Sequence, residues 1–292
     1  MNLRADAPAK INRELRVGPV RSDGFHEIRS RLAAIDLADS IEVEPGDGAL
    51  ALVCEGLEVP CDEFNLVVRA GRALAERLGR PADARIRLEK RIPPGAGLGG
   101  GSSDAARALV LLSRLWGSPL SEEGLSELAA SLGSDVPFFL VGGEAEVTGR
   151  GEHVTPLPDS EPMDLLVLVP PFSISTAQVY ATYRRLESGS PSDHRRIPAA
   201  LEVESSGKFF GPNDLALAVL ETKVKMSVLL DSALSLASEC TITGSGSAIV
   251  LAGAAADADE RLSNRYPEAR IFRCRTLTRE EYRLRTESSG RF

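Results

Sequence analysis

The sequence predicts a protein of two domains, each built from both α-helices and β-strands. At 292 residues the chain is long enough for two hydrophobic cores. Alternating apolar residues, typical of strands, occur in both halves beside segments with the three- and four-residue spacing of helices. A proline-rich, acidic connector lies at 156–162. We therefore expect domains at 1–158 and 159–276, followed by a charged and loosely held tail at 277–292.

The first half is expected to contain strands, then helices, then a hairpin. Alternation and turn residues indicate strands, and side chains that accept hydrogen bonds indicate where helices begin. The expected strands are one through Ile11 and Val17, separate stretches at 28–35 and 40–43, and others at 84–90 and 144–147. The expected helices run from a cap at Asn65 to Gly79, over 102–115, and from a cap at Ser121 to Gly133.

The second half gives five further predictions, drawn from the same signals. They are a central strand at 165–169, a helix capped by Thr176 that carries Tyr180, a mobile surface loop at 187–197, a helix capped by Asn213, and a glycine-serine turn at 241–247 that precedes an apolar strand. That turn is explained equally well as a plain hairpin and as an anion site.

The most informative stretch is K-R-I-P-P-G-A-G-L-G-G-G-S-S-D-A-A, residues 90–106. Glycines wind tightly and bring backbone N–H groups close to one anion, and a helix start adds unpaired N–H donors. A flexible linker is the plain alternative, but this stretch leads directly into a helix pattern. It follows neither common nucleotide motif, because Gly101 stands where the Walker lysine would be and no acidic residue follows at the dinucleotide spacing. We interpret it as a phosphate-binding loop of another kind.

Composition excludes several classes of protein. The net charge of −8 argues against nonspecific nucleic-acid binding. No apolar run approaches the ~20 residues that cross a bilayer, and residues 1–10 lack the apolar core of a signal peptide. The cysteines at 54, 61, 240 and 274 show no C-x-x-C pairing, so we expect free thiols and a cytoplasmic protein.

Three single residues are ambiguous when read alone. Lys10 opens the first strand and is by default a surface charge, and His26 is by default a turn histidine. Asp135 follows a helix end, beside a run of large apolar residues. Two interpretations of Asp135 are equally well supported: it caps the next turn, or it is a carboxylate able to accept or orient a hydroxyl proton.

The glycine loop closely resembles the second motif of the GHMP kinases. Within that superfamily, six further blocks in register resemble the 4-diphosphocytidyl-2-C-methyl-D-erythritol kinases. They are P-A-K-I-N at 8–12, D-G-F-H-E-I at 23–28, N-L-V-V-R-A at 65–70, G-S-D-V-P-F-F-L at 133–140, T-G-R-G-E at 148–152 and T-G-S-G-S at 243–247. Together they cover nearly the whole chain apart from the tail.

The resemblance implies an α+β, two-domain GHMP kinase fold. Its N-terminal domain would be ribosomal-protein-S5-like and its C-terminal domain a ferredoxin-like α/β sandwich, with the active site between them. The implied reaction transfers the γ-phosphoryl of ATP to the 2-hydroxyl of 4-diphosphocytidyl-2-C-methyl-D-erythritol, in the non-mevalonate route to isoprenoid precursors. The implied partners are these two small molecules and Mg²⁺, with no nucleic acid and no membrane.

Carried over by motif, Lys10 and Asp135 match the family's catalytic pair. Phosphoryl transfer requires positioning and charge stabilisation, which a carboxylate at the acceptor hydroxyl and an adjacent ammonium supply. The resemblance also implies the binding residues. For ATP these are Pro93, Pro94, Gly95, Ala96, Gly97, Leu98, Gly99, Gly100, Gly101, Ser102 and Ser103. For the cytidine substrate they are Asn12, Phe25, His26, Thr176, Tyr180, Gly244, Ser245 and Gly246. Ser103 or Asp104 is the expected magnesium contact.

Two positions depart from the family pattern. Arg13-Glu14 replaces a usually apolar pair, and Phe25 stands where tyrosine is commoner. Two alternatives to the implied function remain, namely a GHMP kinase for another small alcohol and a catalytically silent nucleotide-binding protein. The retained Lys10 and Asp135 argue against the silent protein.

Overall fold

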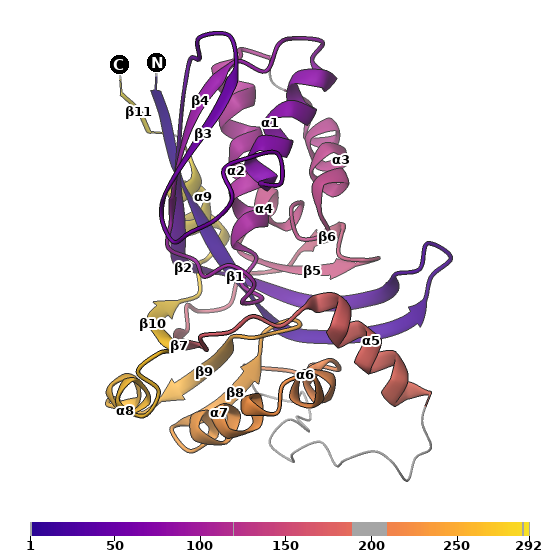
Figure 1. Cartoon of the computed structure of the whole chain (residues 1–292), viewed down its shortest axis with the longest axis vertical. Helices are drawn as coiled ribbons and strands as arrows, with labels where there is room; N and C mark the ends of the chain where they lie inside the picture. The colour runs from indigo at the N-terminus through magenta and orange to yellow at the C-terminus, as the bar shows by residue number, and fades with distance from the viewer. Residues whose placement is uncertain (1, 119, 189–208, 288, 292) are drawn as a thin grey trace.

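The structure, a computed structural model, describes residues 2–118, 120–188, 209–287 and 289–291. Two sheets form its frame (Figure 1). The first sheet has the order β11-β1-β2-β4-β3, with β5 paired to β2 and β6 to β5. Its strands are β1 (Asn2–Val20), β2 (His26–Glu44), β3 (Leu50–Gly56), β4 (Ala84–Lys90), β5 (Glu144–Thr148), β6 (His153–Pro156) and β11 (Ser289–Arg291).

The second sheet is antiparallel in the order β10-β7-β9-β8. Its strands are β7 (Asp164–Val169), β8 (Ala237–Ile242), β9 (Ile249–Ala254) and β10 (Arg270–Arg275). The continuous apolar run of β7 lies inside this sheet, as its sequence predicts.

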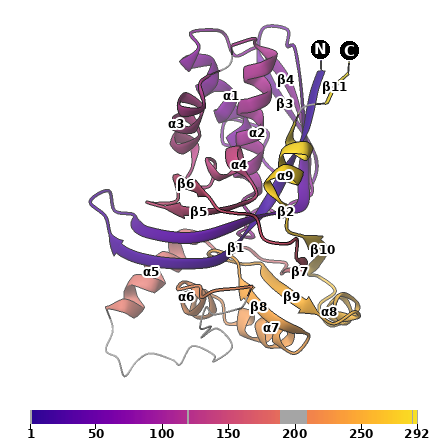
Figure 2. The same ribbon diagram turned by 180° about the vertical axis from the view of Figure 1, so that it is seen from behind.

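Helices cover both sheets, as seen from two sides in Figures 1 and 2. Those beside the first sheet are α1 (Leu66–Arg77), α2 (Gly100–Leu115), α3 (Glu122–Leu132), α4 (Phe138–Val141) and α9 (Arg279–Thr286). Those beside the second are α5 (Thr176–Glu187), α6 (Ala216–Thr222), α7 (Lys225–Leu234) and α8 (Ala258–Arg265). None of the described helices is long and apolar enough to span a membrane.

Strands β1 and β2 form one long hairpin that reaches from the first sheet across the second domain (Figure 1). Residues 28–35 and 40–43 were expected as separate strands and instead belong to the single β2. Pro8 lacks a backbone donor, and the register of the β1–β2 pair shifts between Pro8 and Lys10. The shift allows one strand to bend from one sheet towards the other.

A shared core joins the two halves. Ala9 and Ile11 of β1, Leu98 of the glycine loop and Val167 of β7 belong to one buried apolar cluster. Two further cores lie on either side of it, one between the first sheet and α1 and α2, the other between the second sheet and α6 and α7. The glycine loop is therefore fixed between the domains by hydrophobic contacts.

Local signals gave several correct boundaries. Asn65 and Ser121 cap α1 and α3 through their side chains, and β4 covers 84–90 as expected. Two capping predictions are wrong in detail. Ser175, not Thr176, caps α5, because its hydroxyl accepts from Gln178 N. Leu215, not Asn213, is the N-cap of α6, while Asn213 stabilises the preceding turn by accepting from Leu215 N at 3.0 Å.

The expected loose tail at 277–292 is wrong for its described residues. The chain returns to the first domain, where α9 packs near β1 and β11 extends the first sheet beside β1. Tyr282 is 2% exposed and donates its hydroxyl hydrogen to Phe139 O at 2.6 Å. A complete capping box at Thr278 and Glu281 begins the helix. The predicted surface loop at 187–197 lies outside the described residues from 189 onwards.

Candidate active site

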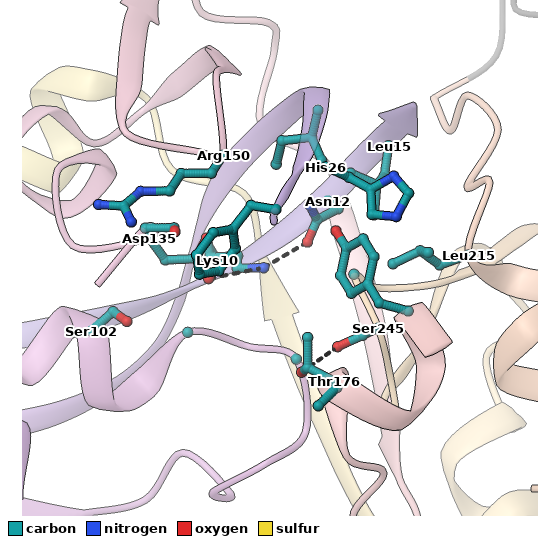
Figure 3. A pocket seen from close by; sticks show the side chains of 18 of the residues that line it. Lys10, Asn12, Leu15, His26, Ser102, Asp135, Arg150, Thr176, Leu215 and Ser245 are labelled. Carbon is teal, nitrogen blue, oxygen red and sulfur yellow. Dashed lines mark hydrogen bonds and ion pairs between the residues drawn. The ribbon is translucent and has the colours of Figure 1, made fainter. Parts of the chain in front are cut away.

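A cavity of about 560 Å³ lies where the glycine loop, the β1–β2 hairpin and the second domain meet, and we call it the acceptor cavity. Figure 3 shows ten of its side chains by name. It brings together residues from 10 to 245, including most of those that the resemblance assigns to the cytidine substrate. Its lining includes Lys10, Asn12, Phe25, His26, Asp135, Thr176, Tyr180, Gly244 and Ser245.

Lys10 and Asp135 meet at the floor of this cavity. Lys10 Nζ lies 3.6 Å from Asp135 Oδ2 and donates to Asn12 Oδ1 at 2.6 Å. The side chain of Lys10 is 5% exposed, whereas that of Asp135 is 40% exposed. A buried ammonium thus faces an accessible carboxylate. This geometry allows the carboxylate to accept a hydrogen bond from an alcohol while the ammonium offsets negative charge nearby.

Asn12 holds the lysine in place. Its amide nitrogen Nδ2 donates to Ser30 Oγ at 2.8 Å, which orients Oδ1 towards Lys10. Its backbone N donates to Thr243 Oγ1 at 2.9 Å, so a residue of the second domain is bonded to the same strand. The lysine position therefore depends on both domains.

The glycine loop packs directly on the lysine strand and on the second domain. Gly97 has φ +81°, and a Cβ built on it would lie 2.5 Å from Thr243 O. A Cβ on Gly99, with φ +71°, would lie 3.0 Å from Lys10 Cγ. Both positions therefore require glycine. Ala248 N donates to Ala96 O at 3.0 Å and fixes the loop to the turn before β9.

Helix α2 begins at this loop and directs its amino end towards it. Gly99 is the N-cap and has no side chain with which to satisfy the first N–H groups. Those donors and the positive end of the helix dipole favour an anion at this place. The glycine stretch thus has a fixed backbone that leads into a helix, and not the open course of a linker.

A second cavity, of about 310 Å³, lies on the other side of the loop, and we call it the loop cavity. It is lined by Pro93 to Ser102 and Asp104, and opposite them by Val59, Pro60, Asn65 and Leu66. Gly97, Gly99 and Ser102 line both cavities. A group bound along the loop would therefore be next to a group bound at Lys10 and Asp135.

The aromatic end of the acceptor cavity is formed by Phe25, His26 and Tyr180. Phe25 is 52% exposed, while the rings of His26 and Tyr180 stack with centroids 5.5 Å apart. His26 Nδ1 lies 2.9 Å from Gly18 O, so it carries the hydrogen, and Nε2 is left as a buried acceptor without a protein partner. Burial, with the Asp135 charge, raises the pKa of Tyr180 to about 12, so its phenol stays protonated.

The turn between β8 and β9 supplies the opposite wall. Ser245 Oγ lies 2.8 Å from Thr176 Oγ1, which joins this turn to the start of α5. Gly244 lies beside Asn12, since a Cβ on it would be 3.1 Å from Asn12 Oδ1. Gly246 packs under the glycine loop and does not line the cavity. The turn is a hairpin that also contributes to the site.

Of the two residues expected to contact a metal, Asp104 lines the loop cavity and Ser103 lines neither cavity. Ser103 is 1% exposed and donates its hydroxyl hydrogen to Pro8 O at 2.7 Å. Asp104 is 2% exposed; its Oδ2 accepts from Lys90 Nζ at 2.7 Å, whereas its Oδ1 has no hydrogen-bond partner. Within the described residues no group of three or more His, Cys, Asp and Glu side chains could hold a metal ion. The two expected residues thus offer one unpaired, buried carboxylate oxygen, which does not by itself make a resident metal site.

Asp104 belongs to a buried charge cluster that its sequence position did not reveal. Lys90 Nζ also pairs with Asp39, whose Oδ1 accepts from the backbone N–H groups of Arg91 and Ile92. Burial raises the pKa of Asp104 to about 8, because desolvation and the Asp39 charge outweigh the attraction of Lys90. The cluster fixes the chain on both sides of the glycine loop.

Sequence reasoning also missed two arginines of the acceptor cavity, Arg150 and Arg184. Arg150 stands in the block T-G-R-G-E at 148–152, which contributed to the resemblance but gave no role to its central residue. Arg184 lies one helical turn after Tyr180, and that spacing was a signal that both side chains share a face of α5.

Known proteins give a consistent comparison. The family model described as the GHMP kinases N terminal domain matches residues 65–143. The 4-diphosphocytidyl-2-C-methyl-D-erythritol kinase of Pelotomaculum thermopropionicum is 46% identical over 185 residues, which are 63% of this chain. The kinase of the same name from Salinispora arenicola is 41% identical over 271 residues, which are 88% of this chain. The alignments span 64% and 85% of these two relatives, respectively.

A crystal structure of 4-(cytidine 5'-diphospho)-2C-methyl-D-erythritol kinase superposes with a TM-score of 0.75 at 33% identity. The match covers 94% of this chain and 98% of that one. It confirms the predicted α+β GHMP kinase fold. At that coverage the similarity extends through both halves of the chain. The chain belongs to the 4-diphosphocytidyl-2-C-methyl-D-erythritol kinase family of the GHMP kinases.

Proposed function

We propose that the chain transfers the γ-phosphoryl group of ATP to the 2-hydroxyl of 4-diphosphocytidyl-2-C-methyl-D-erythritol. The observation that carries this proposal is the 3.6 Å contact between Lys10 and Asp135, in a cavity that shares three residues with the loop cavity. An ATP lying in the loop cavity would have its terminal phosphate at this junction. An alcohol at Asp135 would then face it.

In this mechanism Asp135 orients the acceptor hydroxyl and accepts its proton as the O–P bond forms. Lys10, held by Asn12, stabilises charge on the transferring phosphoryl oxygens. The backbone N–H groups at the start of α2 bind the ATP phosphates. Mg²⁺ enters as part of the MgATP substrate, since the Ser103 hydroxyl is engaged within the protein and Asp104 offers only one buried carboxylate oxygen.

The cytidine end of the substrate is proposed to lie between Phe25 and Tyr180. The buried acceptor Nε2 of His26 suits the exocyclic amino group of cytosine, which is a donor, and would leave the carbonyl of uracil unpaired. This end of the cavity gives a reason for preferring a cytidine substrate over smaller alcohols. The four cysteines are free thiols, which is consistent with a cytoplasmic enzyme.

Parallel assays with several acceptors test the proposal. Purified protein, ATP and Mg²⁺ are offered 4-diphosphocytidyl-2-C-methyl-D-erythritol, homoserine, mevalonate or galactose, and ADP release is measured. We expect release with the first acceptor alone. Release with a different acceptor would assign another small-molecule kinase activity. No release with any acceptor would favour a silent nucleotide-binding protein.

A further inference from the structure

Thr243 opens the turn between β8 and β9, and it lines neither the acceptor cavity nor the loop cavity. The residue is 0% exposed. Its hydroxyl oxygen accepts from Asn12 N at 2.9 Å, and its hydroxyl hydrogen is directed to Asn12 Oδ1 at 3.3 Å. A buried hydroxyl of the second domain therefore contacts one residue of β1 twice.

Asn12 Oδ1 is also the atom that holds the lysine of the candidate active site. It accepts from Lys10 Nζ at 2.6 Å, a bond drawn in Figure 3. If the amide were turned by 180°, its NH₂ group would face the ammonium, and two donors repel each other. Ser30 Oγ accepts from Asn12 Nδ2 at 2.8 Å and favours the observed orientation. Thr243 adds a donor to Oδ1 from the second domain, so the amide is oriented from two sides.

The backbone of Thr243 is fixed within its own turn. Thr243 N donates to Ala248 O at 3.0 Å, and Thr243 O accepts from Gly246 N at 3.0 Å. A β-branched side chain has few rotamers. On this fixed backbone, the hydroxyl of Thr243 therefore has a defined direction.

Asn213 fixes the carbonyl groups on either side of Thr243. Its Nδ2 donates to Ile242 O at 2.7 Å and to Gly244 O at 2.8 Å. Asn213 also lies beside β1, where it forms a parallel bridge with Leu15. It lines neither cavity. One side chain thus joins the turn to the strand that carries the lysine.

We propose that Thr243 and Asn213 are positioning residues of the phosphoryl transfer, an inference that rests on the proposed function. Asn213 fixes the turn, and the Thr243 hydroxyl orients the Asn12 amide that holds the Lys10 ammonium. A displacement of about 1 Å at a reacting group lowers a rate about 100-fold. The second domain therefore takes part in placing the lysine through two residues that line neither cavity.

Replacement of Thr243 by an isosteric residue tests this inference. The measurement is single-turnover transfer of ³²P from γ-labelled ATP to 4-diphosphocytidyl-2-C-methyl-D-erythritol, with both substrates saturating. Thr243→Val keeps the shape of the side chain and removes the hydroxyl. The transfer rate should fall about 5- to 30-fold, the effect of one or two hydrogen bonds, while KM for ATP changes by less than about twofold.

Two further threonine variants give the comparison. Thr243→Ser keeps the hydroxyl and should restore a rate close to that of the wild type. Thr222→Val removes a threonine hydroxyl that donates to Ala218 O at 2.7 Å within α6, and it should leave the rate unchanged.

An Asn12→Ala background shows whether Thr243 acts through Asn12. The amide that Thr243 orients is then absent, so adding Thr243→Val should slow transfer further by at most about threefold. A purely structural role of Thr243 would instead give the same loss of rate in both backgrounds.

Asn213→Asp tests the support of the turn and leaves Thr243 in place. It removes both donors and places a carboxylate opposite two carbonyl oxygens, so the transfer rate should fall about 10- to 100-fold. Asn264→Asp, at an exposed position on α8, is the matched control and should transfer at the wild-type rate. Urea unfolding establishes which variants are folded.

The inference is overturned if folded Thr243→Val or folded Asn213→Asp transfers at the wild-type rate. It is also overturned if Thr243→Ser loses as much rate as Thr243→Val, or if the loss is equal in the Asn12→Ala background. Loss of folding in both Thr243→Val and Asn213→Asp would assign the pair to stability and overturn it too. A wild type that gives no labelled product would overturn the proposed function as well.

Discussion

The backbone N–H of Lys10 donates to the carbonyl of Leu98 at 2.9 Å, which makes the lysine strand and the glycine loop one structural unit. The same loop is bonded to the second domain through Ala96 and Ala248. A displacement of the loop would therefore move the lysine and the phosphate-binding backbone together. The predictions below concern this unit and the elements that support it.

Gly97→Ala should damage the site without unfolding the protein. Its Cβ would be 2.5 Å from Thr243 O, and backbone on both sides leaves little room for relief. A shift of the loop by about 1 Å is expected to lower kcat/KM for ATP about 100-fold. Steady-state kinetics measure the effect. Gly79→Ala is the matched control, because Gly79 also has a positive φ (+62°) but has no atom within 4 Å of the new Cβ. Equal activity in the two variants would contradict the account.

Tyr180→Ala should chiefly weaken binding of the cytidine substrate. Loss of one stacking ring is worth about 1–3 kcal/mol for a base, so KM for that substrate should rise about 10- to 100-fold while KM for ATP stays near the wild-type value. Tyr180→Phe keeps the ring and should behave like the wild type. An unchanged KM in the alanine variant would remove Tyr180 from the cytidine site.

Tyr282→Ala should destabilise the first domain. The ring is 2% exposed in the core and its hydroxyl bonds to Phe139 O, so the variant is expected to lose about 3–5 kcal/mol of unfolding free energy. Leu284→Ala alters a side chain on the same helix that is 64% exposed, and it should change the unfolding free energy by less than about 0.5 kcal/mol. Urea unfolding compares them. A Tyr282→Ala protein as stable as the wild type would restore the expectation of a loose tail.

The buried carboxyl of Asp104 should make stability depend on pH. Its folded pKa is about 8 against an ordinary value of 3.8, so between these values the folded state holds a proton that the unfolded state has lost. Stability due to this group is therefore greatest below about pH 4 and decreases as pH rises towards 8. Asp104→Asn mimics the protonated form and should remove this decline.

Urea unfolding at pH 5 and pH 8 tests the expected direction of this pH dependence. The wild type should lose more stability between the two values than Asp104→Asn, by at most about 1.4 kcal/mol per pH unit. Asp257→Asn, at a carboxylate 60% exposed, should follow the wild type. If Asp104→Asn shows the same decline as the wild type, the proton is not held at Asp104.

Sequence patterns predicted what short-range physics determines. The side chains of Asn65 and Ser121 accept hydrogen bonds from N–H groups two and three residues away, and β4 has alternating buried and exposed residues. The predictions of these two helix caps and of this strand were therefore correct. The last helix was missed because α9 is mostly charged and buries chiefly Tyr282, in a core formed by distant residues. Its burial depends on where the chain returns, which no local pattern encodes.

The candidate site likewise contains residues that the sequence identified and residues that it did not. Lys10 and Asp135 were ambiguous as single residues and became a pair only through the family's motifs, since they lie on separate elements. The cluster of Lys90, Asp39 and Asp104 was not foreseen, because a buried lysine and an exposed one look alike in sequence. The division of the chain at residue 158 stays a prediction.

The central claim is that Asp135, beside Lys10, acts in phosphoryl transfer to an alcohol. Transfer of ³²P from γ-labelled ATP to 4-diphosphocytidyl-2-C-methyl-D-erythritol in a single turnover tests it most directly, with wild type and Asp135→Asn at equal bound ATP. The account predicts complete transfer by the wild type and a rate about 100- to 10,000-fold lower in the variant, whose fold is retained. Transfer by Asp135→Asn at the wild-type rate, or no labelled product from the wild type, would contradict it.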